Sequence, residues 1–517
     1  MATLKLQNGR FRSHIDPSMQ VATRCTTPIY NAAPPYHPSM AYAEARTAFV
    51  SSGPNLAYAL LRALFHDLGY DDKRYGTPAW NPLGHIIKPG QTVVIKPNFV
   101  LSYNASGSSL EAIITHPSIL RAMVDYAFIA LNGEGRIVIA DAPQMDCCWA
   151  DLMAFQRLDT IQDFYYGEFG FPVEVVDLRN FELIDNKLPG YPSNRHALAG
   201  DPQGSRIVNL GTRSQFYGLA SENYYGADYD RSVTNSHHQG ETQEYCVSRT
   251  ILDSDVFISV PKMKVHKKVG VTLNLKGLVG INTNKNYLVH YRLGTPSTGG
   301  DQLPDGRPTS DNFVVRTQRW LMDRTLARES ALGELVYKTA AGMYQHLIRR
   351  VAPVSKETRV TDAGNWFGND SAWRMTADLA HIIHYCDRNG VVQSEPQRKF
   401  LSVIDGIVGG EDNGPLAATA KPVGALVVGE NLHAADMVAT RLMGFDARTL
   451  KQFAIGDKPF DAEAISVIRD GISLSGREFF DPFDRQPHLA FRPHPGWIGH
   501  IEMDRVSETS RQMAEAI

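Results

Sequence analysis

The sequence predicts an α/β protein with a largely parallel, doubly wound (Rossmann-like) sheet in two halves, a β-rich insertion and a long helical insertion. Three observations predict this class. Short apolar segments of strand length alternate with segments of helical spacing. Several strand segments end in a charged or polar residue, at the edge where open α/β sheets bind their ligands. The length of 517 residues exceeds what one hydrophobic core usually serves, so at least two subdomains are expected.

The chain opens with an arm and a first α/β half. Residues 1–50 are polar and proline-rich, which predicts an irregular arm. Residues 51–180 form the first half, in which strands at Thr92–Ile95 and Arg136–Ala140 flank a helix at 119–131. A strand–helix–strand unit of this kind predicts a right-handed parallel crossover.

The remaining segments differ in composition. They are a β-rich insertion at 181–250, a central basic strand–loop element at 251–305, a helical insertion at 306–360, a second α/β half at 361–450 and a C-terminal segment that wraps the surface at 451–517. The second half contains strands at Lys399–Ile404 and Val423–Val428. The helical insertion has a narrow apolar stripe, which favours a lid or an oligomer contact over a core helix. A hairpin packed on its own domain is the alternative.

The central element carries the chemistry of the chain. A buried strand at Val256–Val260 ends at Pro261, because proline cannot donate to a continuing ladder. The basic residues that follow are Lys262, Lys264, His266, Lys267, Lys268, Lys276, Lys285, His290 and Arg292. No Asp or Glu occurs between Val256 and Gly300, in a chain whose formal net charge is −3. A local cationic loop predicts a site for a small anion, and the alternative is a solvated lysine-rich surface.

A second strand end belongs to the same predicted pocket. The strand at Thr92–Ile95 is followed by Lys96 and Asn98, and the ends of neighbouring parallel strands share one edge of a sheet. The residues expected to bind substrate there are Lys96, Asn98, Lys262, Thr272, Asn274 and Lys285. The candidates for acid, base or charge-stabilising roles are His266, Lys264, Lys276 and His290.

Carboxylates in the second half form a candidate metal set. Asp405 follows a strand, Glu411 lies in the glycine-rich stretch after it, and Asp436 lies in the next helix. Carboxylate oxygens beside a phosphate-binding surface are how proteins hold Mg²⁺ or Mn²⁺. Either ion is therefore a candidate cofactor. The alternative is that Asp405 caps a turn and Asp436 caps a helix.

The composition excludes several classes of protein. A net charge of −3 disfavours nucleic-acid binding. The sequence has no apolar run long enough to span a membrane and no apolar signal core near its start. Its five cysteines, an odd number without metal-site spacing, are typical of reduced thiols. We therefore expect a cytoplasmic chain that binds neither nucleic acid nor a membrane, with a homo-oligomer left open.

Six phrases of the sequence resemble one protein family. They are IKPNFV, VPKMKVHKKVGVTLNLKGLVG, NKNYLVHYRLGTPSTGGDQLP, GNWFGNDSAWRMTADL, IDGIVGGEDNGP and AADMVATRLMGFD. In this order, from about Thr92 to Asp446, they resemble the domain of unknown function 362 family, to which no general activity is assigned. In this context Asn369, Asp370 and Arg374 are expected to face the site, although Arg374 is also spaced to pair with Asp378 on a helix surface. Some members carry ferredoxin-like cysteine runs; this chain has none, so no iron–sulfur cluster is expected.

The leading functional hypothesis is an enzyme of unassigned reaction. It would act on a small phosphorylated or carboxylated molecule in the Lys/His/Asn-rich pocket, with metal assistance as an option. The sequence contains no nucleotide-binding or α/β-hydrolase fingerprint. One alternative is a non-catalytic protein that binds an anionic ligand or assembles through this pocket. The other is a proton-transfer enzyme of isomerase or epimerase type that uses Lys and His as its bases.

Overall fold

The computed structural model describes residues 19–30, 33–183, 195–219, 223–227, 231–306, 360–455, 458–481 and 487–503, with a few isolated positions between 332 and 339. The helical insertion predicted at 306–360 lies almost entirely outside these residues.

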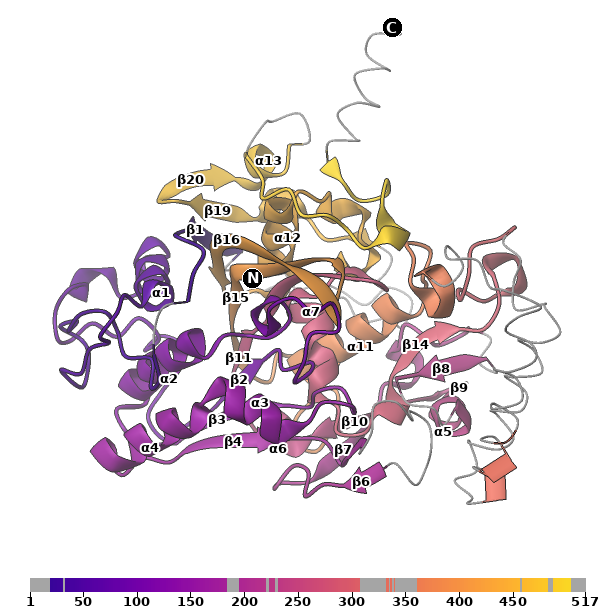
Figure 1. Ribbon diagram of the computed structural model, residues 1–517, viewed down its shortest axis with the longest axis horizontal. Helices are drawn as coiled ribbons and strands as arrows, with labels where there is room; N and C mark the ends of the chain where they lie inside the picture. The colour runs from indigo at the N-terminus through magenta and orange to yellow at the C-terminus, as the bar shows by residue number, and fades with distance from the viewer. Residues whose placement is uncertain are drawn as a thin grey trace, which may run out of the picture.

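A sheet of 11 strands forms the centre of the described part of the chain (Figure 1). Its main path runs β20–β19–β1–β16–β15–β11–β2–β3–β4, and β12 and β13 extend it beside β15. The strands are β1 (Gln20–Cys25), β2 (Thr92–Pro97), β3 (Arg136–Asp141), β4 (Val173–Asp177), β11 (Val256–Val260), β12 (Lys262–His266), β13 (Gly270–Val271), β15 (Lys399–Asn413), β16 (Ala417–Gly429), β19 (Ser466–Arg469) and β20 (Ile472–Ser475). The strands from β4 to β15 on this path run parallel, whereas β16 is antiparallel to both β15 and β1. The predicted α/β class with a mostly parallel central sheet is confirmed.

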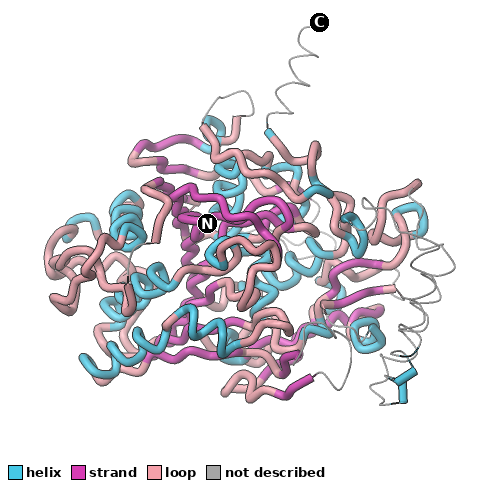
Figure 2. The backbone as a smooth tube through the Cα atoms, viewed as in Figure 1, coloured by secondary structure: helices cyan, strands magenta, loops and turns pink. Residues whose placement is uncertain are grey.

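Helices cover both faces of the sheet, and Figure 2 shows the strands running through the middle of the molecule. The helices are α1 (Leu56–Asp67), α2 (Pro117–Leu131), α3 (Trp149–Gln156), α4 (Leu158–Phe169), α5 (Arg231–Ser236), α6 (Arg249–Leu252), α7 (Leu273–Gly277), α11 (Ala372–Tyr385), α12 (Leu432–Met443) and α13 (Gly476–Phe479). None of the helices in the described ranges combines the length and apolar character needed to cross a bilayer.

The core has two layers because successive strand residues point to opposite faces. Val94 and Phe257 belong to the cluster that includes side chains of α7, α11 and α12, whereas Ile95 and Ile258 belong to the cluster that includes α1, α2 and α4. Each fully buried side chain of this size contributes roughly 1.5–3 kcal/mol. Burial on both faces explains why these strands are continuous apolar segments in the sequence.

The chain between β4 and α11 also forms short strands outside the central sheet. They are β5 (Phe181–Leu183), β6 (Arg195–Ala197), β7 (Ser205–Asn209), β8 (Tyr224–Gly226), β9 (His238–Gln239), β10 (Thr242–Ser248) and β14 (Val289–Arg292). They pair as β7–β10–β9, β14–β8 and β5–β6, apart from the central sheet. A further pair, β17 (Ala454–Ile455) and β18 (Lys458–Pro459), lies after α12.

Both ends of the sequence differ from expectation. Residues 20–25, expected to be part of an irregular arm, form β1, which pairs with β16 and β19 inside the sheet. The C-terminal segment, expected to wrap the surface, supplies β19 and β20 to that sheet. These strands are short, and β1 mixes Thr, Arg and Cys with its apolar residues, so the apolar pattern was too weak to predict them.

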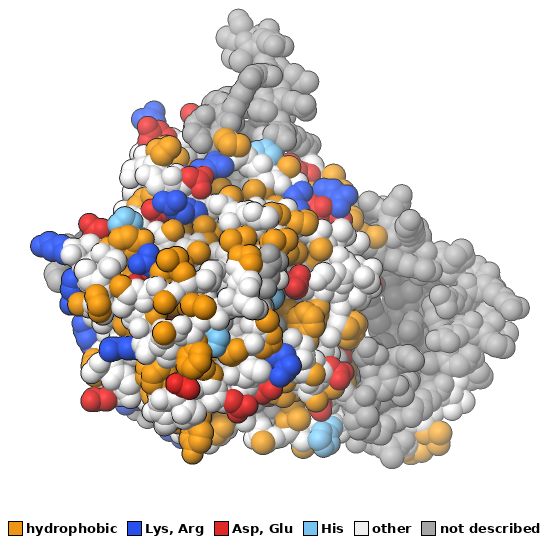
Figure 3. All heavy atoms as spheres, turned by 60° about the vertical axis from the view of Figure 1, so that its left-hand side comes forward, with side chains coloured by type: hydrophobic (Ala, Val, Ile, Leu, Met, Phe, Trp, Pro, Cys, Tyr) orange, Lys and Arg blue, Asp and Glu red, His pale blue; other side chains and the backbone are white. Residues whose placement is uncertain are grey.

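The basic stretch is also different from the cationic loop that we expected. Pro261 interrupts β11, but the chain continues as β12 along β15, with Lys262 opposite Asp405. All five residues of β12 are buried. The alternative of a solvated lysine surface is therefore wrong for this segment. On the face shown in Figure 3, lysine and arginine side chains are scattered among other residues, whereas the lysines of β12 lie inside the molecule.

Candidate functional site

The candidate site begins where three neighbouring parallel strands end. Lys96 of β2 lies opposite Ser259 of β11, and β3 ends at Asp141. The Lys96 Nζ atom lies 2.9 Å from Asp141 Oδ1, and both side chains are about 97% buried or more. Asp141 also accepts a hydrogen bond from the Phe99 backbone N–H, at 2.7 Å. Lys96 therefore lies at the edge that the parallel strands share, and its partner there is a carboxylate.

A second buried ion pair lies at the junction of β12 and β15. Lys262 Nζ lies 3.0 Å from Asp405 Oδ2, and both side chains are fully buried. The hydroxyl of Tyr30 donates to Asp405 and accepts from Lys262 Nζ at 2.8 Å. The ring of Tyr30 stacks on His116, whose backbone N–H donates to Asp405 at 3.0 Å. The amine of Lys262, predicted to bind substrate, is therefore bonded to protein groups. So are both carboxylate oxygens of Asp405, which was predicted to bind a metal.

Three more buried lysines donate to backbone carbonyls. Lys264 Nζ lies 2.6 Å from the oxygen of Ile113, and Lys285 Nζ lies 2.8 Å from that of Ala142. Lys268 donates to the carbonyl of a residue preceding α11, Ala363. Burial lowers the pKa of Lys264 well below its usual value and that of Lys285 to about 7. These lysines connect segments that are distant in the sequence, which is a structural role.

Lys276 differs from these residues. It is 6% exposed, and its amine has no hydrogen-bond partner within the described part of the chain. Burial, together with the charge of Lys267, lowers the pKa of Lys276 to about 7. One turn earlier on α7, the buried hydroxyl of Thr272 also has no hydrogen-bond partner among the described residues. Both groups therefore have unused hydrogen-bonding capacity within the described part of the chain.

Two imidazoles lie within electrostatic reach of Lys276. Burial and the charge of Lys276 hold the pKa of both His266 and His290 well below the usual value, so both rings are neutral. Nδ1 of His266 accepts from the Lys268 backbone N–H, which leaves the proton on Nε2. Nδ1 of His290 lies 3.1 Å from the Leu288 carbonyl oxygen and must donate to it, which leaves Nε2 as an acceptor. One ring thus presents a donor and the other an acceptor. We call Thr272, Lys276, His266 and His290 the Lys276 centre.

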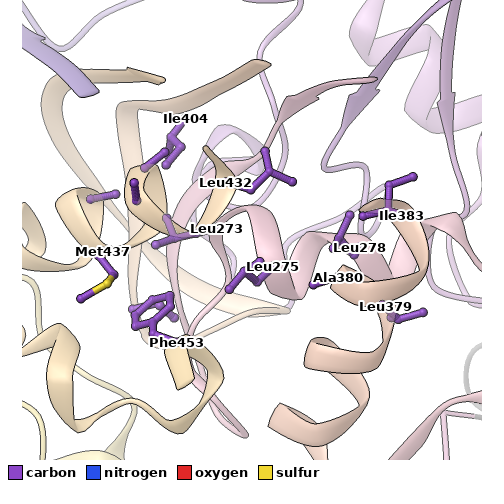
Figure 4. Packing of buried hydrophobic residues seen from close by; sticks show 14 of the residues in the cluster. Leu273, Leu275, Leu278, Leu379, Ala380, Ile383, Ile404, Leu432, Met437 and Phe453 are labelled. Atoms are coloured by element: carbon purple, nitrogen blue, oxygen red, sulfur yellow. The ribbon is translucent and has the colours of Figure 1, made fainter. Parts of the chain in front are cut away.

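A residue of another helix stabilises the backbone of the Lys276 centre. Leu273, the first residue of α7, has φ +47°, a left-handed conformation that costs a non-glycine residue of order 1 kcal/mol. Asp436 of α12 fixes it by accepting hydrogen bonds from the backbone N–H groups of Asn274 and Leu275 and from the Asn274 amide. Figure 4 shows Leu273 and Leu275 lying between Met437 of α12 and Leu379 of α11.

The candidate metal set has separate partners. Asp436 caps α7, Glu411 pairs with Lys421 and Arg492, and Asp405 pairs with Lys262. The described residues contain no group of three or more His, Cys, Asp or Glu side chains that could hold a metal ion. The three carboxylates are thus not assembled as a metal site, and the alternative role of Asp436 as a helix cap is what the structure shows.

The other residues predicted to bind a ligand have different surroundings. Asn98 has a buried amide oxygen without a partner among the described residues, as has Asn274, whose amide nitrogen donates to Ser402. Asn369 supports the centre indirectly, because its amide donates to the carbonyl of His290. Arg374 pairs with Asp370, and the pairing with Asp378 does not form; Arg374 lines a different cavity.

Tyr30 and His116 were not predicted from the sequence. Tyr30 lies in the expected irregular arm, so no local pattern pointed to it. His116 directly precedes Pro117 at the first position of α2, and its side chain accepts from Ser118 as the N-cap. Histidine is an uncommon N-cap, whereas serine, which occurs two residues later at Ser118, is a typical one.

The fold and the strand ends define an α/β protein with buried Lys–Asp ion pairs at the carboxyl ends of its parallel strands. The model of the family described as "Domain of unknown function (DUF362)" matches residues 205–441, and over these residues the predicted resemblance is confirmed. The IKPNFV phrase lies before the matched region. No curated protein matches the chain.

One solved structure is similar in part. It is a crystal structure of a Thermotoga maritima protein, with 9% sequence identity and a TM-score of 0.29. The match covers 74% of this chain and 59% of that chain, so the present chain spans less than two thirds of its length.

Proposed function

We propose that this chain is an enzyme that acts on a small anionic molecule, phosphorylated or carboxylated, at the Lys276 centre. The observation that carries the proposal is the unpartnered amine of Lys276, buried near two neutral imidazoles that present one donor and one acceptor. Lys267 adds positive charge near this amine. An anion would receive the hydrogen bonds that Lys276 and Thr272 do not make within the described part of the protein.

The same arrangement favours proton transfer as the reaction. An amine with a pKa of about 7 exchanges protons readily at neutral pH, because the best acid–base groups titrate near the working pH. The acceptor nitrogen of His290 would take a proton from carbon next to a carboxylate, and the Lys276 ammonium would return one. The donor N–H of His266 would hydrogen-bond to the developing negative charge. This is the isomerase or epimerase alternative of the sequence analysis. A non-catalytic anion-binding protein would use the same groups for binding alone.

A thermal-unfolding assay tests the anion site. Phosphate and malonate should raise the Tm of the wild type, because a ligand that binds only the folded state adds RT ln(1 + [L]/Kd) to its stability. The Lys276→Gln variant should lose most of this increase, whereas Lys73→Gln, which removes an exposed lysine elsewhere, should keep it. An equal increase in all three proteins would show that the anions act nonspecifically.

Isotope exchange separates the enzyme from the binding protein. We expect wild-type protein in D₂O to incorporate deuterium at the carbon next to a carboxylate in malate or 2-phosphoglycerate, measured by NMR, and Lys276→Gln to lose this activity. Stabilisation by these compounds without exchange would favour the binding alternative.

Several finer expectations remain predictions. Helices on both faces of the sheet support our proposal of a doubly wound sheet in two halves. We also propose the β-rich and helical insertions that the sequence predicts. An Mg²⁺ or Mn²⁺ cofactor is testable by metal analysis of the purified protein, and a homo-oligomer by light scattering. All five cysteines are free thiols, which supports the proposed cytoplasmic location. We propose no nucleic-acid partner.

A further inference from the structure

One cavity, of about 410 Å³, shares none of its lining residues with the Lys276 centre. It is bounded by α11, by α12 and by the segment that follows α12. Its lining residues are Gln215, Trp373, Arg374, Met437, Ala447, Arg448, Thr449, Leu450, Lys451, Phe453, Ala454 and Phe460. A volume of this size is within the range of small-molecule sites.

Most of the cavity wall is apolar and aromatic. Met437, Leu450, Phe453 and Phe460 each have 5% or less of their surface exposed, so this part of the wall is fixed by packing in the core. The half-buried Trp373, on α11, also lines the cavity. Flat aromatic walls of this kind suit the ring of a ligand.

Basic and acidic side chains cluster at the α11 end of the cavity. One carboxylate, Asp370, is shared by three cations: Arg292 and Arg374 at 3.0 Å each and Lys451 at 3.3 Å. Although burial acts to raise it, the charges of Arg374 and Lys451 lower the pKa of Asp370, so the carboxylate is ionised. Two further acidic residues lie beside these cations: Asp301 accepts from the backbone N–H groups of Arg292 and Asp370, and Asp378 accepts from that of Gln215. The remaining basic side chain, Arg448, is matched by Asp446 at 2.8 Å and by the charge of Asp481.

We propose that this cavity binds a small molecule with an aromatic ring and one acidic group, such as a carboxylate or phosphate. The acidic group lies against Lys451 and Arg374, and the ring packs among Trp373, Phe453 and Phe460. Lys451 makes one ion pair with its three N–H donors, and its side chain is 53% exposed, so it reaches an incoming anion without breaking the Asp370 cluster. This site is independent of the proposed reaction at the Lys276 centre.

Calorimetric titration with 1-naphthyl phosphate tests the proposal, with 1-naphthol and inorganic phosphate as matched partial ligands. We expect saturable binding of one 1-naphthyl phosphate per cavity, and weaker binding of both partial ligands. Lys451→Gln should weaken binding of 1-naphthyl phosphate about two- to fivefold, the value of one exposed ion pair, and leave 1-naphthol unchanged. Ala454→Leu, which adds volume to the lining, should weaken both ring-containing ligands.

Two control variants separate this site from others. Lys73→Gln should bind 1-naphthyl phosphate as the wild type does, and so should Lys276→Gln. If Lys276→Gln alone abolishes binding, the molecule occupies the Lys276 centre and the cavity proposal is wrong. Binding that is unaffected by both Lys451→Gln and Ala454→Leu, or the absence of saturable binding at millimolar ligand, also overturns it.

Discussion

Buried lysines are the main feature of this protein at the scale of single residues. Removing an ammonium group from water is costly unless its hydrogen bonds are replaced. Carboxylates replace them for Lys96 and Lys262, and backbone carbonyls for Lys264, Lys268 and Lys285. Lys276 lacks such a replacement among the described residues, and this exception distinguishes a candidate catalytic group from structural ones.

Gly280 shows how closely the Lys96–Asp141 pair is packed. A Cβ atom at this position would lie 1.9 Å from Asp141 Oδ1 and 2.7 Å from Lys96 Nζ. Gly280→Ala should therefore separate the pair and destabilise the protein by about 3–5 kcal/mol, as breaking buried ion pairs does. Urea unfolding measures this change.

The matched control is another glycine-to-alanine change. Gly167 lies in α4 with no atom within 4 Å of an added Cβ. Gly167→Ala should be neutral or stabilise by about 0.5–1 kcal/mol, because alanine loses less backbone freedom in a helix. Equal stability of the Gly280→Ala protein and the wild type would show that the ion pair tolerates displacement.

The sequence alone identified the lysines but not their roles. The absence of acids between Val256 and Gly300 marked the basic stretch. The partner of Lys264, however, is the carbonyl of Ile113, 151 residues away, and Asp405 is 143 residues from Lys262. Such contacts depend on how strands pair, which local patterns do not specify, so the free amine of Lys276 was visible only in the structure.

At the scale of elements, the short helix α7 depends on one carboxylate. Burial raises the pKa of Asp436 to about 7, although three N–H donors from Asn274 and Leu275 oppose this change. The pKa of this carboxyl is thus higher in the folded than in the unfolded state. Its contribution to stability is complete at low pH and is lost as the pH rises from about 4 through about 7.

The Asp436→Asn variant isolates this effect because its side chain does not titrate. We expect the stability of the wild type relative to this variant to fall between pH 5 and pH 7, by at most about 1.4 kcal/mol per pH unit. Chemical denaturation of both proteins at each pH measures the difference. A relative stability that increases with pH would instead show that the hydrogen bonds dominate and the carboxylate is charged.

Long apolar strands were predictable at this scale, and short ones were not. The strands expected at Thr92–Ile95, Arg136–Ala140 and Val256–Val260 are all present, because each is buried on both faces. β12 was missed because alternating lysines are typical of exposed segments, and only its position beside β15 explains their burial.

At the scale of the whole molecule, the sheet joins distant parts of the chain. β1 lies between β16 and β19, and Val21 of β1 is fully buried. Val21→Asp would place an unpaired charge in this sheet and should destabilise the protein on the order of 4 kcal/mol or more. The Tm and the soluble yield measure the effect.

The control lies just beyond the same strand. Thr27 is exposed, so Thr27→Asp adds the same charge without burying it and should leave the Tm within about 1 °C. A Val21→Asp protein as stable as this control would show that β1 is dispensable and that the segment is an arm after all.

The position of β1 also has a consequence for biosynthesis. Thr23 donates to Leu426, 403 residues later, and at ribosomal rates of about 5–20 residues per second this separation corresponds to roughly 20–80 s. During that time the nascent chain has β1 without the strands that flank it, and one of them, β19, is made later still. We expect a segment that stays unpaired for this long to bind a chaperone at the ribosome exit. Slower translation would prolong its exposure.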